Sequence, residues 1–230
     1  ANPKTVVVLI AGSPVEVFDW IDQIPAVMMG WYAGMEGGHA LANVLFGEVN
    51  PSGKLPFTFP IRLEDSPAHA LGEYPGSNYE VTYNEKIFVG YRYFDSKNIQ
   101  SQFCFGHGLS YTDFEYGNLK INSDGNRNEP QIQIEITLRN RGDREGKEVV
   151  QIYVGDVEAS VERPKKELKA FKKVNLSSGE SKKVSFSLDK NAFSFYDMQS
   201  SSWKVEPGLF RIFIGGSSQD IRLSRDIEVF

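Results

Sequence analysis

The stretch that decides the fold runs from Ala26 to Pro60 and reads AVMMGWYAGMEGGHALANVLFGEVNPSGKLPFTFP. Residues 26–32 form a short apolar run, which predicts a strand buried on both faces. Glycines then break the run, and a helix is expected from about Glu36, whose carboxylate would complement the helix dipole. Apolar residues alternate in 55–59 between two prolines, which confines this tail to a sheet edge or to an unpaired extended segment.

Two turn signals lie between the predicted helix and the tail. Gly47 stands where a glycine commonly follows the end of a helix. The run Asn50-Pro51-Ser52-Gly53 has proline second and glycine fourth, which predicts a type I turn.

The residues before Ala26 extend the same pattern. Thr5–Ala11 is a continuous β-branched run, expected as a central parallel strand, and Val15–Ile21 can form a short helix. With the stretch above this gives β-α-β-α-β, the tail of a doubly wound parallel sheet. Two or three strands are too few for such a sheet, so we expect the missing strands to come from upstream or from another chain.

The pattern changes twice along the rest of the chain. From Arg62 to about Gln102 the periodicity fades, and prolines and glycines indicate an extended linker. From about Phe114 short strands alternate apolar and polar residues, as in QIQIEITL (131–138), and about seven of them predict an antiparallel β-sandwich. The predicted fold class is therefore α/β plus all-β. The expected domains are the C-terminal part of an α/β sandwich (1–61), an extended linker (62–113) and a β-sandwich (114–230).

Composition excludes several classes of function. The chain has 230 residues, 40% of them hydrophobic and 24% charged, which is typical of globular proteins. Its formal net charge of −5 argues against nucleic acids and anionic membranes as partners. The single cysteine, Cys104, permits no internal disulfide, and the three histidines lack metal-ligand spacing. We therefore expect no metal and no cofactor, and the missing phosphate loop argues against a nucleotide-binding domain.

The stretch 26–60 closely resembles the C-terminal part of family-3 glycoside hydrolases of the β-glucosidase and β-xylosidase type. The segment YNEKIFVGYRYF (83–94) resembles a family segment in which glycine usually stands at the position of Lys86. The resemblance implies a fibronectin-type-III-like fold for the predicted sandwich. The motifs that carry it are Trp31-Tyr32, Gly34–Gly38, Ala42–Gly47, Asn50–Pro60, Phe103–Tyr111 and Glu148–Phe171.

This resemblance implies a C-terminal fragment of a retaining β-glycosidase that hydrolyses terminal β-linked glucose or a related sugar. The mechanism needs two carboxylates roughly 5–5.5 Å apart. In the family one lies in an N-terminal barrel and the other upstream of the strand that 5–11 matches, so we expect no catalytic residue here. The implied partners are a β-glycoside or oligosaccharide, bound in the parent's active site, and the missing barrel domain. The compartment stays open, with a periplasmic or secreted bacterial location favoured.

Five residues are candidates for substrate binding or for a domain interface: Glu36, Tyr83, Glu85, Tyr91 and Arg92. Glu36 either serves as a substitute catalytic carboxylate or caps the helix, and the cap is favoured. Glu85 lines the rim of a sugar pocket, or forms an ion pair or hydrogen-bond clasp, with Arg92 as one possible partner. The tyrosines offer flat faces with hydroxyl tips, suited to sugar rings and to wet interfaces.

The alternative function is a non-catalytic carbohydrate-binding or adhesion module. It would need exposed aromatic residues that form a sugar platform on the sandwich. We expect Trp20, Trp31 and Trp203 in cores or interfaces, which is the more frequent place for tryptophan.

Overall fold

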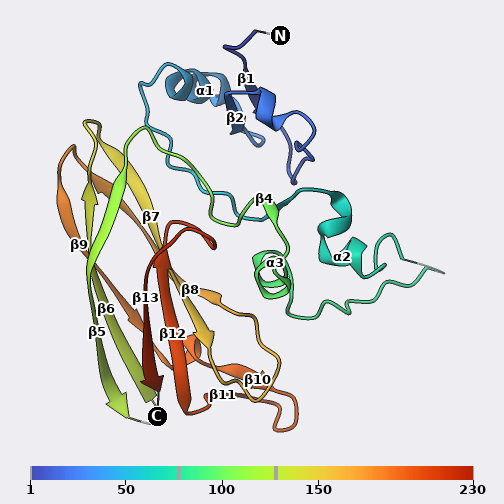
Figure 1. The fold of residues 1–230 in the computed structure, drawn as a ribbon, viewed down its shortest axis with the longest axis vertical. Helices are drawn as coiled ribbons and strands as arrows, with labels where there is room; N and C mark the ends of the chain where they lie inside the picture. Colours follow the sequence, from blue (N-terminus) through green and yellow to red (C-terminus); the bar gives the residue numbers. More distant parts are fainter. Residues whose placement is uncertain (1, 77–78, 127–128, 230) are drawn as a thin grey trace. The chain divides into compact units, whose positions relative to one another are not determined.

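The structure is a computed structural model that describes residues 2–76, 79–126 and 129–229. Its contacts divide the chain into two compact units (Figure 1). The first unit comprises Ala1–Pro51 and Leu55–Gly106, and the second comprises Ser52–Lys54 and His107–Phe230. The short segment Ser52–Lys54 therefore belongs to the second unit, although its neighbours in sequence on both sides belong to the first.

The first unit begins with two parallel strands. β1 (Val6–Leu9) pairs with β2 (Ala26–Met29) in register, Val6 opposite Ala26. The pairing confirms the predicted parallel arrangement, but both strands are shorter than 5–11 and 26–32. They are also half-exposed and not buried on both faces. The described residues give this sheet only two strands, so each strand has a free edge and little covers its faces.

The helix expected at Val15–Ile21 is not formed. One turn lies there, followed by the 3-10 helix η1 (Ile21–Gln23). Pro25 explains the early end, because the residue before a proline is driven out of the α region. Ile24 is indeed extended, with φ −116° and ψ 121°.

The helix predicted from about Glu36 is confirmed as α1 (Gly37–Leu45). Phe46 ends it, and Gly47 follows in the left-handed region at φ 80°, as the sequence indicated. None of the helical residues is buried, so the predicted apolar stripe is only partly covered.

The tail after α1 is extended as predicted, but it does not form the type I turn expected at residues 50–53. Residues 52–54 pack with the second unit, which draws the chain out of a turn. β3 (Phe59–Pro60) pairs antiparallel with β4 (Ser101–Phe103) and is a short edge-like strand, in agreement with its proline.

The linker is less extended than the sequence indicated. It contains the 3-10 helix η2 (Leu63–Asp65) and the helices α2 (Pro67–Ala70) and α3 (Tyr91–Lys97). Pro67 occupies the first helical position of α2, where a proline costs no hydrogen bond. Tyr93 and Phe94 of α3 are buried with Phe88 in a small core, so packing rather than periodicity decides this helix.

The second unit is the predicted sandwich of seven strands. One sheet has the order β5-β6-β9 and the other β13-β12-β7-β8, with all pairs antiparallel (Figure 1). The bounds are β5 (Phe114–Asn126), β6 (Glu129–Asn140), β7 (Gly146–Asp156), β8 (Glu167–Leu176), β9 (Ser181–Leu188), β12 (Gly208–Gly215) and β13 (Ile221–Val229).

The sandwich core is made by the inner faces of both sheets. In β6 the apolar residues at 132, 134, 136 and 138 are fully buried, while the polar residues between them are exposed (Gln133) or half-buried (Glu135 and Thr137). They meet Ile152 of β7 and Ile212 of β12 in one continuous cluster. The polar residues 122–126 lie in β5, and residues 127–128 fall outside the described residues.

Two small elements lie between β9 and β12. The 3-10 helix η3 (Lys190–Ala192) is followed by a hairpin of β10 (Phe195–Asp197) and β11 (Ser202–Lys204).

Lys86 holds a backbone conformation that suits glycine, with φ 53°. A residue with a side chain pays about 1–2 kcal/mol for this left-handed conformation, and glycine does not. Part of that gain is offset because glycine also makes the unfolded chain more flexible, which favours unfolding. We expect Lys86→Gly to stabilise the first unit by about 0.5–1 kcal/mol, seen as a higher melting temperature. Lys97→Gly, at the last residue of α3, is the matched control and should destabilise, because it puts glycine in a helical position and removes the ammonium that lies 5.6 Å from the ring centroid of Phe88. A lower melting temperature for Lys86→Gly would contradict the interpretation.

Candidate functional site

The segment 83–94 holds four of the five candidate residues, and the structure gives two of the three tyrosines in it a packing role. Tyr93 is buried against Phe94, with ring centroids 6.0 Å apart. Tyr91 stacks on Phe105 at a centroid distance of 4.8 Å and an interplanar angle of 29°. Tyr83 differs, because 78% of it is exposed. Of the candidate tyrosines, Tyr83 is therefore the more accessible to a ligand or a neighbouring domain.

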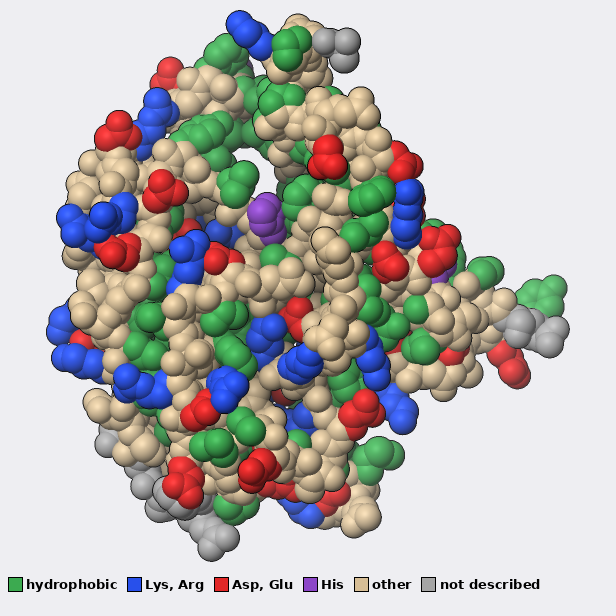
Figure 2. All heavy atoms as spheres, in the orientation of Figure 1, with side chains coloured by type: hydrophobic (Ala, Val, Ile, Leu, Met, Phe, Trp, Pro, Cys, Tyr) green, Lys and Arg blue, Asp and Glu red, His purple; other side chains and the backbone are tan. Residues whose placement is uncertain are grey.

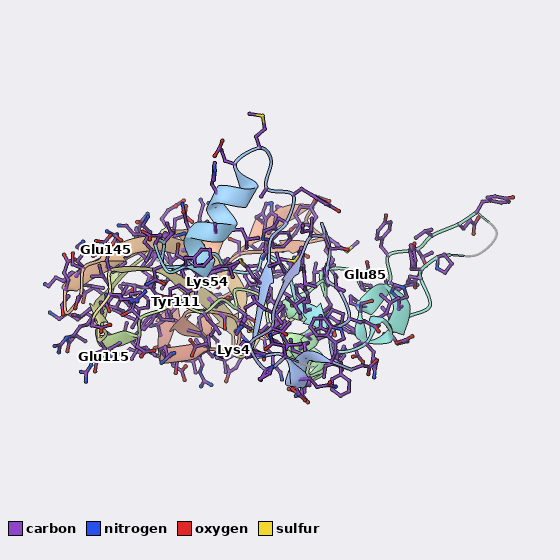
Figure 3. All side chains as sticks on the ribbon, turned by 90° about the horizontal axis from the view of Figure 1, so that it is seen from above. Lys4, Lys54, Glu85, Tyr111, Glu115 and Glu145 are labelled. Carbon is purple, nitrogen blue, oxygen red and sulfur yellow. The ribbon has the colours of Figure 1, made fainter. Side chains whose placement is uncertain are left out.

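The clasp considered between Glu85 and Arg92 is not seen in the part of the chain that the structure describes. Oε2 of Glu85 is buried and has no hydrogen-bond partner there, while Arg92 is engaged elsewhere. Glu85 follows the loop that projects beyond α2 (Figure 3). A buried carboxylate oxygen without a donor is costly, so this oxygen lowers the stability of the segment as it stands.

A different carboxylate closes the projecting loop. Glu73 is buried and accepts hydrogen bonds from the Thr82 hydroxyl and the Asn84 side-chain amide. The bond from Thr82, followed by that from Asn84, lowers the pKa of Glu73 against the opposite effect of burial. The sequence analysis missed Glu73, because no local spacing pairs residues nine and eleven positions apart across a loop.

Glu36 lies at the start of α1 but makes no side-chain cap to the backbone. Its carboxylate instead contacts Nδ1 of His39 at 2.7 Å, and both side chains are exposed. Among the described residues, no hydrogen bond or ion pair joins Glu36 to the segment 83–94. Glu36 is therefore the N-cap residue of α1, as the sequence favoured, but its side chain makes no capping hydrogen bond.

A second group of polar side chains lies in the other unit and centres on Lys54 (labelled in Figure 3). Its ammonium contacts Oε1 of Glu148 at 3.2 Å and donates to the carbonyl of Gly108 at 2.9 Å. Only 16% of the Lys54 side chain and 9% of the Glu148 side chain are exposed. This is a buried ion pair. Removing one partner of such a pair destabilises a protein far more than removing one partner of a surface pair, because the other charge is left buried and unpaired.

Two carboxylates, those of Glu148 and Asp220, approach Gly216 in this group. A Cβ built on Gly216 would lie 3.1 Å from Oδ2 of Asp220 and 3.4 Å from Oε1 of Glu148. Each carboxylate already has a cation, however: Lys54 for Glu148, and Arg222 at 2.6 Å for Asp220. The charges are compensated inside the sandwich, so we interpret the group as structural.

His107 is half-buried in the same group. Burial lowers the pKa of His107, the positive charge of Lys54 lowers it further, and Asp220 acts in the opposite direction. The folded sandwich therefore holds this imidazole more readily in its neutral form.

Other classes of site find no support in the described residues. No group of three or more His, Cys, Asp and Glu side chains there could hold a metal ion. No helix in the same ranges is both long and apolar enough to cross a membrane. Figure 2 shows Lys, Arg, Asp and Glu side chains interspersed over the visible face.

Fold and site together define a class of protein: the end of an α/β layer, a linker with a projecting loop, and a sandwich of the fibronectin type III kind. Residues 1–111 match the glycosyl hydrolase family 3 C-terminal domain, and residues 148–218 match the fibronectin type III-like domain. The chain belongs to glycoside hydrolase family 3 and corresponds to the C-terminal part of its β-glucosidases.

Known relatives match along almost the whole chain. It is 50% identical over 224 residues to thermostable beta-glucosidase B of Acetivibrio thermocellus, covering 97% of this chain and 29% of the relative. It is 46% identical to beta-glucosidase BoGH3A of Bacteroides ovatus, covering 96% of this chain and 30% of the relative. The chain thus spans about 30% of the length of these curated relatives.

Solved structures agree. A GH3 beta-glucosidase of Bifidobacterium adolescentis superposes with a TM-score of 0.94 at 38% identity, covering 99% of this chain and 33% of that one. The beta-glucosidase of Kluyveromyces marxianus in complex with glucose gives 0.91 at 39% identity, covering 100% and 27%.

The lowered pKa of His107 makes the stability of the sandwich depend on pH. The unfolded chain binds a proton on His107 more tightly than the folded sandwich does. The free energy of unfolding is therefore not reduced by this group above the ordinary pKa of 6.5, where the imidazole is neutral in both states. The free energy of unfolding falls as the pH drops from 6.5 through the lower pKa that His107 has in the folded sandwich. His107→Gln should flatten this part of the acid-side loss, measured by hydrogen exchange of the β6 amides between pH 7 and 5. His39→Gln, on exposed α1, is the control; equal pH dependence in wild type and His107→Gln would contradict the prediction.

Proposed function

We propose that this chain is the non-catalytic C-terminal part of a retaining β-glycosidase that releases terminal β-linked glucose or a related sugar. The observation that carries the proposal is the match to beta-glucosidases over 96–97% of the chain at 46–50% identity. An identity this high over two consecutive folds supports a common role for the whole segment. In this proposal the nucleophile and the acid/base lie in other parts of the complete protein.

The ion pairs made by the candidate carboxylates of this chain are consistent with a non-catalytic role. Retaining hydrolysis requires a carboxylate nucleophile and a carboxylic acid roughly 5–5.5 Å apart, both free to act. Glu148 and Asp220 are each neutralised by a cation within the sandwich. Glu36 is held by His39 on an exposed helix.

We propose further that the segment 83–94 meets the rest of the complete protein, at its active site or at a neighbouring domain. The exposed ring of Tyr83 supports this role. Tyr91 and Arg92 would then hold the segment in place from within the first unit. We retain residues 1–61, 62–113 and 114–230 as the proposed domains.

The proposal predicts a division of activity that can be measured. The purified chain should hydrolyse no 4-nitrophenyl β-glucoside, because it lacks an acting nucleophile and proton donor. The protein translated from the complete reading frame should hydrolyse it and release the β-anomer of glucose first, as seen by proton NMR. Turnover by the chain alone that is lost in Glu36→Gln or Glu85→Gln would contradict the first part. Release of the α-anomer would contradict retention.

A further inference from the structure

The hairpin of β10 and β11 presents two aromatic side chains to solvent. Tyr196 and Trp203 are directly opposite each other in the antiparallel register. Their ring centroids lie 5.7 Å apart at an interplanar angle of 74°, so the two rings form a corner. Tyr196 is 51% exposed and Trp203 is 69% exposed. Of the two places expected from sequence, a core or an interface, Trp203 therefore does not occupy the core of its unit.

The base of the hairpin is fixed by a buried cation. The guanidinium of Arg163 lies 5.8 Å from the ring centroid of Phe195, which begins β10. It also donates to the carbonyl of Phe193 at 3.2 Å and pairs with Asp156 at 3.1 Å. Its side chain is only 5% exposed. The hairpin thus has a rigid connection to the sandwich.

The tip of the hairpin is fixed as well. The carboxylate of Asp197 accepts hydrogen bonds from the backbone amide of Gln199 at 3.1 Å and from the hydroxyl of Ser200 at 2.7 Å. It also pairs with Lys204 on the opposite strand. Because base and tip are both held, the two rings keep their corner arrangement without help from a ligand, and binding would lose little conformational entropy.

We propose that Tyr196 and Trp203 form a binding site on the sandwich for a neutral glycan chain. The choice of a β-linked glucan as the preferred glycan rests on the proposed function; the choice of a neutral sugar does not.

The chemistry of the corner fits a sugar ring. A pyranose has apolar C–H faces and polar hydroxyl edges, and flat aromatic rings with a polar tip match both parts. Tyr and Trp provide large, rigid contact areas of this kind at low entropic cost. Two rings that meet at 74° can contact one ring face and one ring edge together.

Other occupants fit less well. Fully covering two aromatic side chains buries at most about 300–500 Å², short of the roughly 800 Å² per partner of a stable protein interface. Single-stranded nucleic acid needs a positively charged groove beside the stacking rings. Here the hairpin lysine, Lys204, is already neutralised by Asp197, and the chain carries a net charge of −5.

The test is affinity electrophoresis of the intact 230-residue chain in gels that contain soluble mixed-linkage barley β-glucan. Wild type should be retarded, Trp203→Ala should bind at least tenfold more weakly, and Trp203→Phe should keep part of the affinity. Tyr74→Ala, which removes an exposed aromatic residue of the other unit, is the matched control and should bind as wild type does. Titration with cellohexaose should shift the tryptophan emission to shorter wavelength in wild type and not in Trp203→Phe.

Four results would overturn the proposal: no retardation of wild type, equal retardation of a folded Trp203→Ala, stronger retardation by anionic polygalacturonate than by β-glucan, or a dimer that Trp203→Ala dissociates without any sugar binding. Hydrogen exchange of the β6 amides establishes that each variant is folded. The binding assay is independent of hydrolysis. A complete protein that cleaves no glucoside, together with a chain that binds glucan, would contradict the proposed function and leave this site in place.

Discussion

The ion pair between Lys54 and Glu148 is the interaction on which the architecture of the sandwich unit depends. It brings three residues from the middle of the first half of the chain, 52–54, into the second unit. The ammonium also donates to the carbonyl of Gly108, so it ties the segment 52–54 to the residues with which the rest of the second unit begins. A buried pair of this kind gains little net energy but is strongly destabilising when half of it is lost.

Close backbone packing surrounds this pair. A Cβ on Gly108 would lie 2.2 Å from the carbonyl oxygen of Gly53, so these two segments touch as only glycine allows. Nearby, Gln151 donates to the carbonyl of Gly216 at 2.6 Å and accepts from the hydroxyl of Tyr153 at 2.5 Å. The side chains of Gln151 and Tyr153 are thus hydrogen-bonded, as burial demands, whereas the nearby hydroxyl of Tyr116 is buried without a partner among the described residues. The aromatic hairpin is held separately, by Arg163 and Asp197.

Much of the fold follows from local sequence. The strict alternation in 131–138 predicts β6, because a period of two places every apolar residue on the inner face. The position of Gly47 after α1 was predicted equally directly, because glycine readily adopts the left-handed conformation that ends a helix. The short helix expected at 15–21 is not formed; the 3-10 helix η1 follows at 21–23 and ends there because Pro25 drives Ile24 out of the α region. The helix α3 was missed because its reason, the burial of Tyr93 and Phe94, is tertiary.

The candidate site was less predictable than the fold. Residue types alone pointed to Glu85 and Arg92 as partners, yet the loop is closed by Glu73 with Thr82 and Asn84. Lys54 and Glu148 are almost one hundred positions apart, so no spacing rule could join them. Whether a tryptophan lies in a core or on the surface depends on the surrounding strands, so the sequence could not decide between a core and an interface for Trp203, which is exposed.

The most direct test of the central claim is a double-mutant cycle on Lys54→Met and Glu148→Gln. The readout is the opening free energy of the Val150 and Ile152 amides in β7, measured by native-state hydrogen exchange, because it reports on the sandwich alone. Each single variant should lose about 3–5 kcal/mol, and the double variant should lose much less than their sum, since it leaves no unpaired charge. Single losses that add within about 0.5 kcal/mol would show that the two residues do not interact, and would contradict the account.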